Sequence, residues 1–141
     1  EEYFIRKLNE FAQAGMVSGI FGDLDLQAHR DWEEKVCITA GMDAVLPLWH
    51  EDHDKLADEF IQAGFKAIIV TVNTDLMPAE FLGREYNLKT ITELKKAGVD
   101  VAGEGGEFHT FVYDGPTFKT QIEYKVLSTN LMPPYQILEL S

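Results

Sequence analysis

The chain has 141 residues, 45% of them hydrophobic and 26% charged, which is enough for one domain with a buried core and ordinary for a soluble globular protein. Its formal net charge of −12 argues against a protein that binds nucleic-acid backbones, because such a protein needs a basic face. The single cysteine, Cys37, leaves no disulfide framework or cysteine-based metal site within the chain. No apolar run reaches membrane-span length, so we expect no membrane partner and a cytoplasmic location.

Four amphipathic stretches in the first hundred residues are predicted to be helices. In each, apolar residues recur at helical spacing and an Ala-Gly pair then follows. A glycine in this place is a C-cap signal, because it adopts the left-handed backbone conformation at low cost. The four pairs are Ala14-Gly15, Ala40-Gly41, Ala63-Gly64 and Ala97-Gly98.

Short apolar runs at 17–21, 44–48 and 67–72 follow three of these glycines and are predicted to be strands. The repeated order of helix, glycine and strand predicts an α/β fold with a mostly parallel sheet flanked by helices. We expect the three strands in one sheet, with Asp23 and Trp49 at its carboxyl-end edge, where ligands bind in parallel sheets.

The rhythm stops after Val99. Residues 108–113, 118–127 and 135–140 are predicted to be strands, because no helical pattern separates them and because 118–127 alternates apolar and polar side chains. This tail is predicted to be a small antiparallel β section. The chain is thus divided at residue 100, into an α/β part at 1–100 and a glycine-loop and β part at 101–141.

A glycine-rich loop at 103–110 is the strongest candidate for a site. Its glycines allow a ligand to approach the backbone closely, and acid, base and hydroxyl groups follow at once. The candidate residues are Gly103, Glu104, Gly105, Gly106, Glu107, His109 and Thr110.

Within this loop, Glu104 and Glu107 can bind Mg²⁺ or an amine, and His109 can transfer a proton near neutral pH. A hairpin turn is the alternative interpretation, although a turn does not require this set of charges. In a regular strand His109 and Thr110 point to opposite sides, so they share a pocket only if the strand is bent.

Three upstream residues extend the candidate site. Asp23 follows the first strand, although it can instead cap the next helix. Arg30 and Arg84 can hold anions, and the alternative for each is a surface role, for Arg30 a pair with Asp31 or Glu34. The cluster at 50–54 lacks the spacing of a His-Glu-x-x-His zinc motif, so no metal site is predicted there.

Together these stretches resemble the diphthine–ammonia ligase family, whose members are N-type ATP pyrophosphatases with a PP-loop fold. The combination is specific, and the resemblance extends from about residue 15 to about residue 118. It rests on Glu104-Gly105-Gly106-Glu107-Phe108-His109-Thr110, Asp114-Gly115-Pro116, Phe21-Gly22-Asp23, His29-Arg30-Asp31-Trp32-Glu33, Pro47-Leu48-Trp49 and Leu82-Gly83-Arg84.

The resemblance implies an enzyme that uses ATP and Mg²⁺ to adenylate a carboxylate and then amidates it with ammonia, releasing AMP and pyrophosphate. Glu104, Glu107 and His109 are then expected to be catalytic, and the other candidates to bind substrates. The carboxylate is expected to be diphthine on elongation factor 2 or a small metabolite. A non-catalytic module that binds an adenine nucleotide is the alternative from another class, and the oligomeric state, a homodimer included, is left open.

The family's phosphate loop, Ser-Gly-Gly-x-Asp-Ser, does not occur in this sequence. We therefore expect the chain to be the C-terminal part of a longer protein and to be inactive alone. On this view residues 1–100 belong to a nucleotide-binding domain, and residues 101–141 bind the second substrate.

Overall fold

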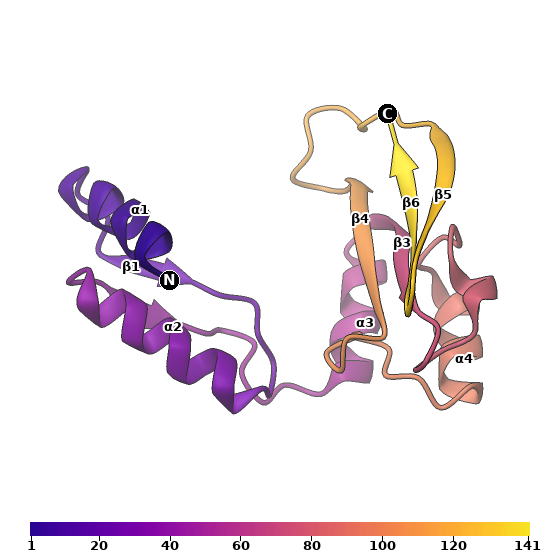
Figure 1. The fold of residues 1–141 in the computed structure, drawn as a ribbon, viewed down its shortest axis with the longest axis horizontal. Helices are drawn as coiled ribbons and strands as arrows, with labels where there is room; N and C mark the ends of the chain where they lie inside the picture. Colours follow the sequence, from indigo (N-terminus) through magenta and orange to yellow (C-terminus); the bar gives the residue numbers. More distant parts are fainter. The chain divides into compact units, whose positions relative to one another are not determined.

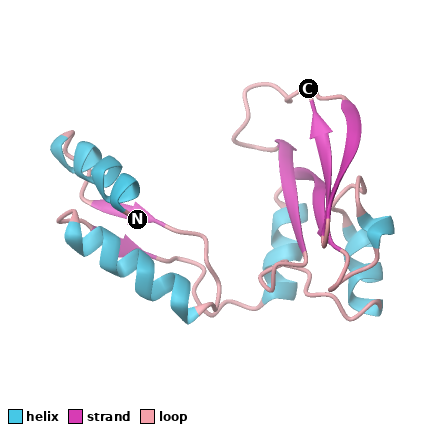
Figure 2. Ribbon diagram, in the orientation of Figure 1, coloured by secondary structure: helices cyan, strands magenta, loops and turns pink.

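A computed structural model describes all 141 residues, which form two compact units, Glu1–Glu51 and Asp52–Ser141. Figure 1 draws the first in indigo and purple and the second in magenta to yellow. The helices and strands of each unit are distinguished by colour in Figure 2. Neither unit contains a helix long and apolar enough to cross a membrane.

The first unit is a small α/β layer. Strands β1 and β2 pair in parallel, with Ser18 opposite Asp43, and the two helices pack on each other through the rings of Phe4 and Trp32, whose centroids are 5.0 Å apart. The core of the unit forms around Val36 and Cys37, which are fully buried. The elements in chain order are α1 (Glu2–Gln13), β1 (Ser18–Ile20), α2 (Gln27–Thr39) and β2 (Asp43–Val45).

The second unit is a four-stranded antiparallel sheet with two α-helices and one 3₁₀ helix. The strand order is β4-β3-β6-β5, so β3 lies between β4 and β6. Buried Ile69, Val72 and Leu94 anchor its core. The elements are α3 (His53–Gln62), β3 (Lys66–Asn73), η1 (Ala79–Phe81), α4 (Leu88–Lys96), β4 (Phe108–Asp114), β5 (Val126–Met132) and β6 (Tyr135–Leu140).

The four predicted helix ends are confirmed. The glycine after each helix has a positive φ, between 70° and 94°. At the first, the N–H of Gly15 donates to the carbonyl of Ala12 and the N–H of Met16 donates to that of Phe11, which is the Schellman pattern. The same pair of bonds closes the helices at Gly41, Gly64 and Gly98.

The α/β class and the antiparallel C-terminal section are also confirmed, but the predicted partner of the third strand is wrong. The run 67–72 lies in β3, which pairs antiparallel with β4 and β6 and is not in the sheet of β1 and β2. A continuous apolar run shows that a strand is buried on both faces, and it does not show which strands cover its edges.

The predicted strand at 118–127 is also wrong, because the regular strand begins only at Val126. Residues 115–125 are irregular instead. The N–H of Phe118 closes a turn onto Gly115, and the N–H of Ile122 donates to the carbonyl of Tyr113. The alternating pattern there has no buried face, since Ile122 is 43% exposed. Residues 101–141 share one compact unit with 52–100, and the division between units falls after Glu51.

Candidate functional site

The loops that follow β1 and β2 lie against each other. Because the strands are parallel, their carboxyl ends meet at one edge of the sheet. The N–H of His50 donates to the carbonyl of Leu24 over 2.7 Å and joins the loop after β1 to the turn after β2. Asp23 and Trp49 therefore lie at the same edge, which confirms that part of the prediction.

A pocket of about 460 Å³ opens beside Asp23 at the start of α2. We call it the Asp23–Glu33 pocket. The Nδ1 of His29 lies 2.7 Å from Oδ1 of Asp23. His29 and Glu33 are one helical turn apart and so lie on the same face of α2. The residues that line the pocket are Asp23, Ala28, His29, Trp32 and Glu33.

Glu33 is the most perturbed group in this pocket. Its side chain belongs to a residue only 4% exposed, and its Oε2 atom has no hydrogen-bond partner. Burial, reinforced by the hydrogen bond to Asp23 and by its charge, raises the pKa of Glu33 to about 7. Burial also opposes ionisation of Asp23, but hydrogen bonds with Glu33 and His29 outweigh it and lower the pKa of Asp23. The two carboxyl groups therefore share one proton up to about neutral pH.

Arg30 connects α2 to the turn after β2. Its guanidinium lies over the indole ring of Trp49, 5.0 Å from the centroid, and its Nε donates to Oε1 of Glu34 at 2.7 Å. The pair with Glu34 is the surface alternative considered above. The contact with Trp49 nevertheless places the cation at the edge that carries Asp23.

In the second unit, Asp100 organises the start of the glycine loop. Its carboxylate accepts hydrogen bonds from the backbone N–H groups of Ala102 and Glu104, and it lies 2.9 Å from Nδ1 of His53. Burial opposes its ionisation, but these hydrogen bonds prevail and lower the pKa of Asp100. The loop is therefore held in one conformation by a satisfied carboxylate.

Glu107 lies at the centre of this loop with one oxygen unused. Its carbonyl accepts a hydrogen bond from the N–H of Asn73, which ties the loop to the end of β3, but Oε2 is buried and has no partner. A Cβ on Gly105 would lie 2.6 Å from Oε1 of Glu107, so a side chain at position 105 would require this carboxylate to move. Gly103 and Gly106 have φ of 73° and 81°, which other residues rarely adopt.

His109 and Thr110 are the second and third residues of strand β4 and are both exposed. They pair with Thr71 and Ile69, with an irregularity in the register between those two partners. A bulge of this kind bends a strand and redirects its side chains. The extra residue here, Val70, lies in β3, so β4 itself has no bulge between His109 and Thr110.

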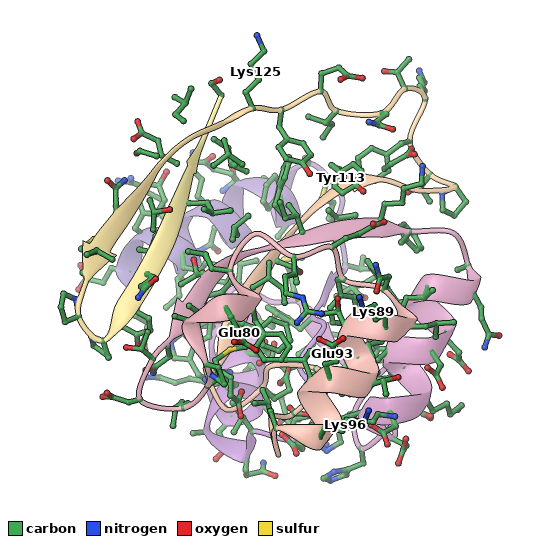
Figure 3. The ribbon with its side chains drawn as sticks, turned by 90° about the vertical axis from the view of Figure 1, so that its right-hand side faces the viewer. Glu80, Lys89, Glu93, Lys96, Tyr113 and Lys125 are labelled. Carbon is green, nitrogen blue, oxygen red and sulfur yellow. The ribbon has the colours of Figure 1, made fainter.

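Arg84 lies beside β3 on the opposite edge from Thr110, since its carbonyl accepts a hydrogen bond from the N–H of Ile69. Its guanidinium pairs with Glu93 and lies 4.8 Å from the centroid of the Phe81 ring. The hydrogen bond from Arg84, with smaller contributions from Lys89 and Lys96, lowers the pKa of Glu93. Lys89, Glu93 and Lys96, which all lie on α4, are labelled in Figure 3.

The predicted site residues thus fall into separate groups. Asp23, Arg30 and Trp49 lie in the first unit, and the glycine loop lies in the second with Arg84. Sequence reasoning missed Glu33, His29 and Asp100 as site-forming groups. The spacing of His29 and Glu33, one turn apart behind Asp23, was the available signal for the first two.

Whether the chain can hold a metal ion depends on how its potential ligand side chains are arranged. No group of three or more His, Cys, Asp or Glu side chains in the structure is arranged to hold one. The cluster at 50–54 is dispersed, with Asp52 capping α3 through the N–H of Lys55 and His53 pairing with Asp100.

Comparison with known proteins identifies relatives of the chain. A family model described as the diphthamide synthase C-terminal domain matches residues 52–132, which begin where the second compact unit begins. A curated relative from Mus musculus, diphthine–ammonia ligase, is 35% identical over 122 residues, covering 77% of this chain and 44% of the relative.

Proteins of the same name from Homo sapiens and Schizosaccharomyces pombe are 37% and 35% identical over 93 and 92 residues. Each match covers 63% of this chain, and 35% and 15% of the relative respectively. The chain therefore spans less than half the length of the curated relatives it matches.

Proposed function

The chain belongs to the diphthamide synthase C-terminal domain family, and from this premise we propose that the protein carrying it is an ATP-dependent ligase that forms an amide from a carboxylate and ammonia. Relatives named diphthine–ammonia ligase support a ligase family of the diphthamide pathway. Diphthine is accordingly the proposed carboxylate.

The observation that carries the proposal is the unpartnered Oε2 of Glu107 in a loop built around it. A buried acceptor without a donor is costly, on the order of 1–3 kcal/mol, and such groups persist where a ligand completes them. The carboxylate lies against Gly105, and His109 and Thr110 are exposed close to it in the chain. The loop is suited to receive a substrate that donates a hydrogen bond.

In the proposed reaction, a carboxylate oxygen of the substrate attacks the α-phosphorus of ATP and pyrophosphate leaves. Ammonia then attacks the acyl carbon of the adenylate, AMP leaves, and the amide nitrogen loses a proton. Glu107 positions the substrate by accepting a hydrogen bond from a donor group elsewhere on it, since the substrate's ionised carboxylate can only accept. His109 transfers a proton in the second step.

Arg30, stacked on Trp49, is proposed to contact the anionic part of the nucleotide. Magnesium is expected with the phosphates of ATP, where it would neutralise charge. Since the described side chains form no metal-binding group, no step is assigned to a metal ion.

The test uses the full-length protein and two assays, ATP–pyrophosphate exchange for adenylation and amide formation for the whole reaction. Glu107→Gln and His109→Ala are each expected to lower amide formation about 100-fold or more, while the melting temperature changes little. Exchange should fall in Glu107→Gln, because adenylation needs the positioned carboxylate, and should change little in His109→Ala, which acts in the second step. Glu123→Gln is the matched control, since Glu123 is an exposed carboxylate in the same unit.

Normal turnover in both loop variants would contradict the proposed roles. Nucleotide binding with neither exchange nor amide formation in the unaltered protein would favour the non-catalytic module instead. The 141-residue chain by itself is expected to show no exchange, because its sequence contains no phosphate loop.

A further inference from the structure

The Asp23–Glu33 pocket contains groups that the proposed roles leave unused. Glu33 is almost fully buried, lines the pocket, and has an oxygen without a hydrogen-bond partner. Asp23 and His29 contribute a second carboxylate and an imidazole, 2.7 Å apart. Two adjacent acidic groups in one pocket are destabilising without a ligand or a proton between them.

The chemistry of the pocket selects its ligand. Carboxylate oxygens only accept hydrogen bonds when ionised, so the ligand must donate several of them. The acidic groups favour a cation, and the aromatic face of Trp32, which lines the same pocket, also favours one. The nearest arginine in sequence, Arg30, is already held by Glu34 and Trp49. A positively charged group with several N–H donors satisfies these oxygens, whereas a divalent metal would require more oxygen ligands.

We propose that the Asp23–Glu33 pocket binds ammonium and that the carboxylate of Glu33 accepts its proton, so that the pocket supplies ammonia for the amidation. The inference rests on the proposed function and adds to it the site of the nitrogen substrate.

The step balances as a proton transfer followed by acyl substitution. One N–H bond of ammonium breaks and one O–H bond forms on Glu33, leaving neutral ammonia. The lone pair of ammonia attacks the acyl carbon, and AMP leaves with the electrons of the acyl–phosphate bond. The nitrogen then loses a second proton to solvent, and Glu33 releases its own to reset the site.

The raised pKa of Glu33 supports this role. An ordinary carboxylate is too weak a base to take a proton from a protonated amine, which has a pKa of roughly 10. A pKa of about 7 reduces this difference. The titratable groups that act on Glu33 are Asp23 and His29, and Glu33 in turn acts on the buried thiol of Cys37. Glu1, which precedes α1, is paired with Lys35 at 2.8 Å.

The experiment measures the dependence of amide formation on ammonium chloride concentration in the full-length protein. Glu33→Gln and Asp23→Asn are each expected to raise the KM for ammonium about 10- to 100-fold, the effect of losing one hydrogen bond to a charged group. ATP–pyrophosphate exchange needs no ammonia and should remain at the level of the unaltered protein. Asp31→Asn is the control, since Asp31 is an exposed carboxylate on the same helix that pairs with Gln27.

Hydroxylamine separates proton transfer from a structural effect. It is mostly unprotonated at neutral pH and needs no base to deliver it, so Glu33→Gln should retain much more turnover with hydroxylamine than with ammonium. An unchanged KM for ammonium in both variants, or an equal loss with both nucleophiles, would overturn the proposal. If Glu33→Gln does not fold, the KM of Asp23→Asn decides.

Failure of the proposed function has a different signature. It would appear as absent exchange and absent amide formation in the unaltered protein. If only the ammonium site is wrong, the unaltered protein will show both activities. The Glu33→Gln and Asp23→Asn variants will then have the same KM for ammonium as the Asp31→Asn control.

Discussion

Each compact unit contains a histidine paired with an aspartate, and the two pairs are built for different purposes. In the second unit, Asp100 is satisfied by His53 and two backbone N–H groups, and this lowers its pKa. In the first unit, Asp23 pairs with His29 but also faces Glu33, whose second oxygen has no partner and whose pKa is raised to about 7. The satisfied pair stabilises a loop, and the unsatisfied one leaves a position for a ligand.

Asp100 and Glu33 should make the stability of the protein depend on pH in opposite directions. Asp100 has a pKa below its unfolded value, so its contribution is present above that value and is lost as the pH falls through the folded pKa. Glu33 has a pKa above its unfolded value, so its contribution is fully present below about pH 4.5 and is lost as the pH rises to about 7.

Glu33→Gln gives the largest expected effect on stability. The amide can donate a hydrogen bond to Asp23 as the carboxylic acid does, but it does not ionise. The shift in the pKa of Glu33 from 4.5 to about 7 corresponds to about 3 kcal/mol. The variant should therefore exceed the unaltered protein in free energy of unfolding by up to about 3 kcal/mol at pH 8. The two should become equal near pH 4. Urea denaturation at several pH values measures this difference. A difference that does not vary with pH would show that ionisation of Glu33 does not destabilise the folded protein.

Asp100→Ala should lower the free energy of unfolding by about 2 kcal/mol, because it leaves His53 and the N–H groups of Ala102 and Glu104 without their acceptor. Asp23→Asn is the matched change in the other unit. It removes a like charge beside Glu33 and should cost less, or stabilise the protein above pH 7. Thermal and urea unfolding at pH 7.5 compare the two variants. A greater loss in Asp23→Asn would show that the roles of the two aspartates are reversed.

Substitutions of two glycines in the loop at 103–110 should have smaller effects on stability. Gly103→Ala combines a positive φ with a new Cβ 3.1 Å from the carbonyl oxygen of Phe108, whereas the site of a Cβ on Gly106 is open. We expect the first variant to cost about 2 kcal/mol and the second about 1 kcal/mol, the ordinary cost of the left-handed conformation. Urea unfolding of both variants measures the difference. Equal costs would mean that the loop relaxes around residue 103.

Much of the fold could be predicted because its signals are local. Each helix end follows from a glycine and from an apolar residue directly after it, such as Met16 or Val99, and all of these interactions lie within six residues. The position of Asp23 and Trp49 at one edge follows from the direction of parallel strands.

The partner strands of β3 and the start of β5 could not be predicted in the same way. The apolar side chains of the run 67–72 do not favour one neighbouring strand over another. Only the folded chain brings β4 and β6 to its two edges. Alternation between Phe118 and Val126 suggested a strand, but a strand needs a partner, and residues 115–124 make only isolated backbone hydrogen bonds.

The candidate sites show the same division. The sequence by itself determined which groups are available in the loop at 103–110, because glycines, carboxylates and a histidine are properties of the residues. Only the tertiary structure decided that Asp100 holds this loop, that Glu107 keeps an unpaired oxygen, and that Glu33 is buried against Asp23. A pKa depends on burial and on charges brought near through space, and neither is a property of the order of residues along the chain.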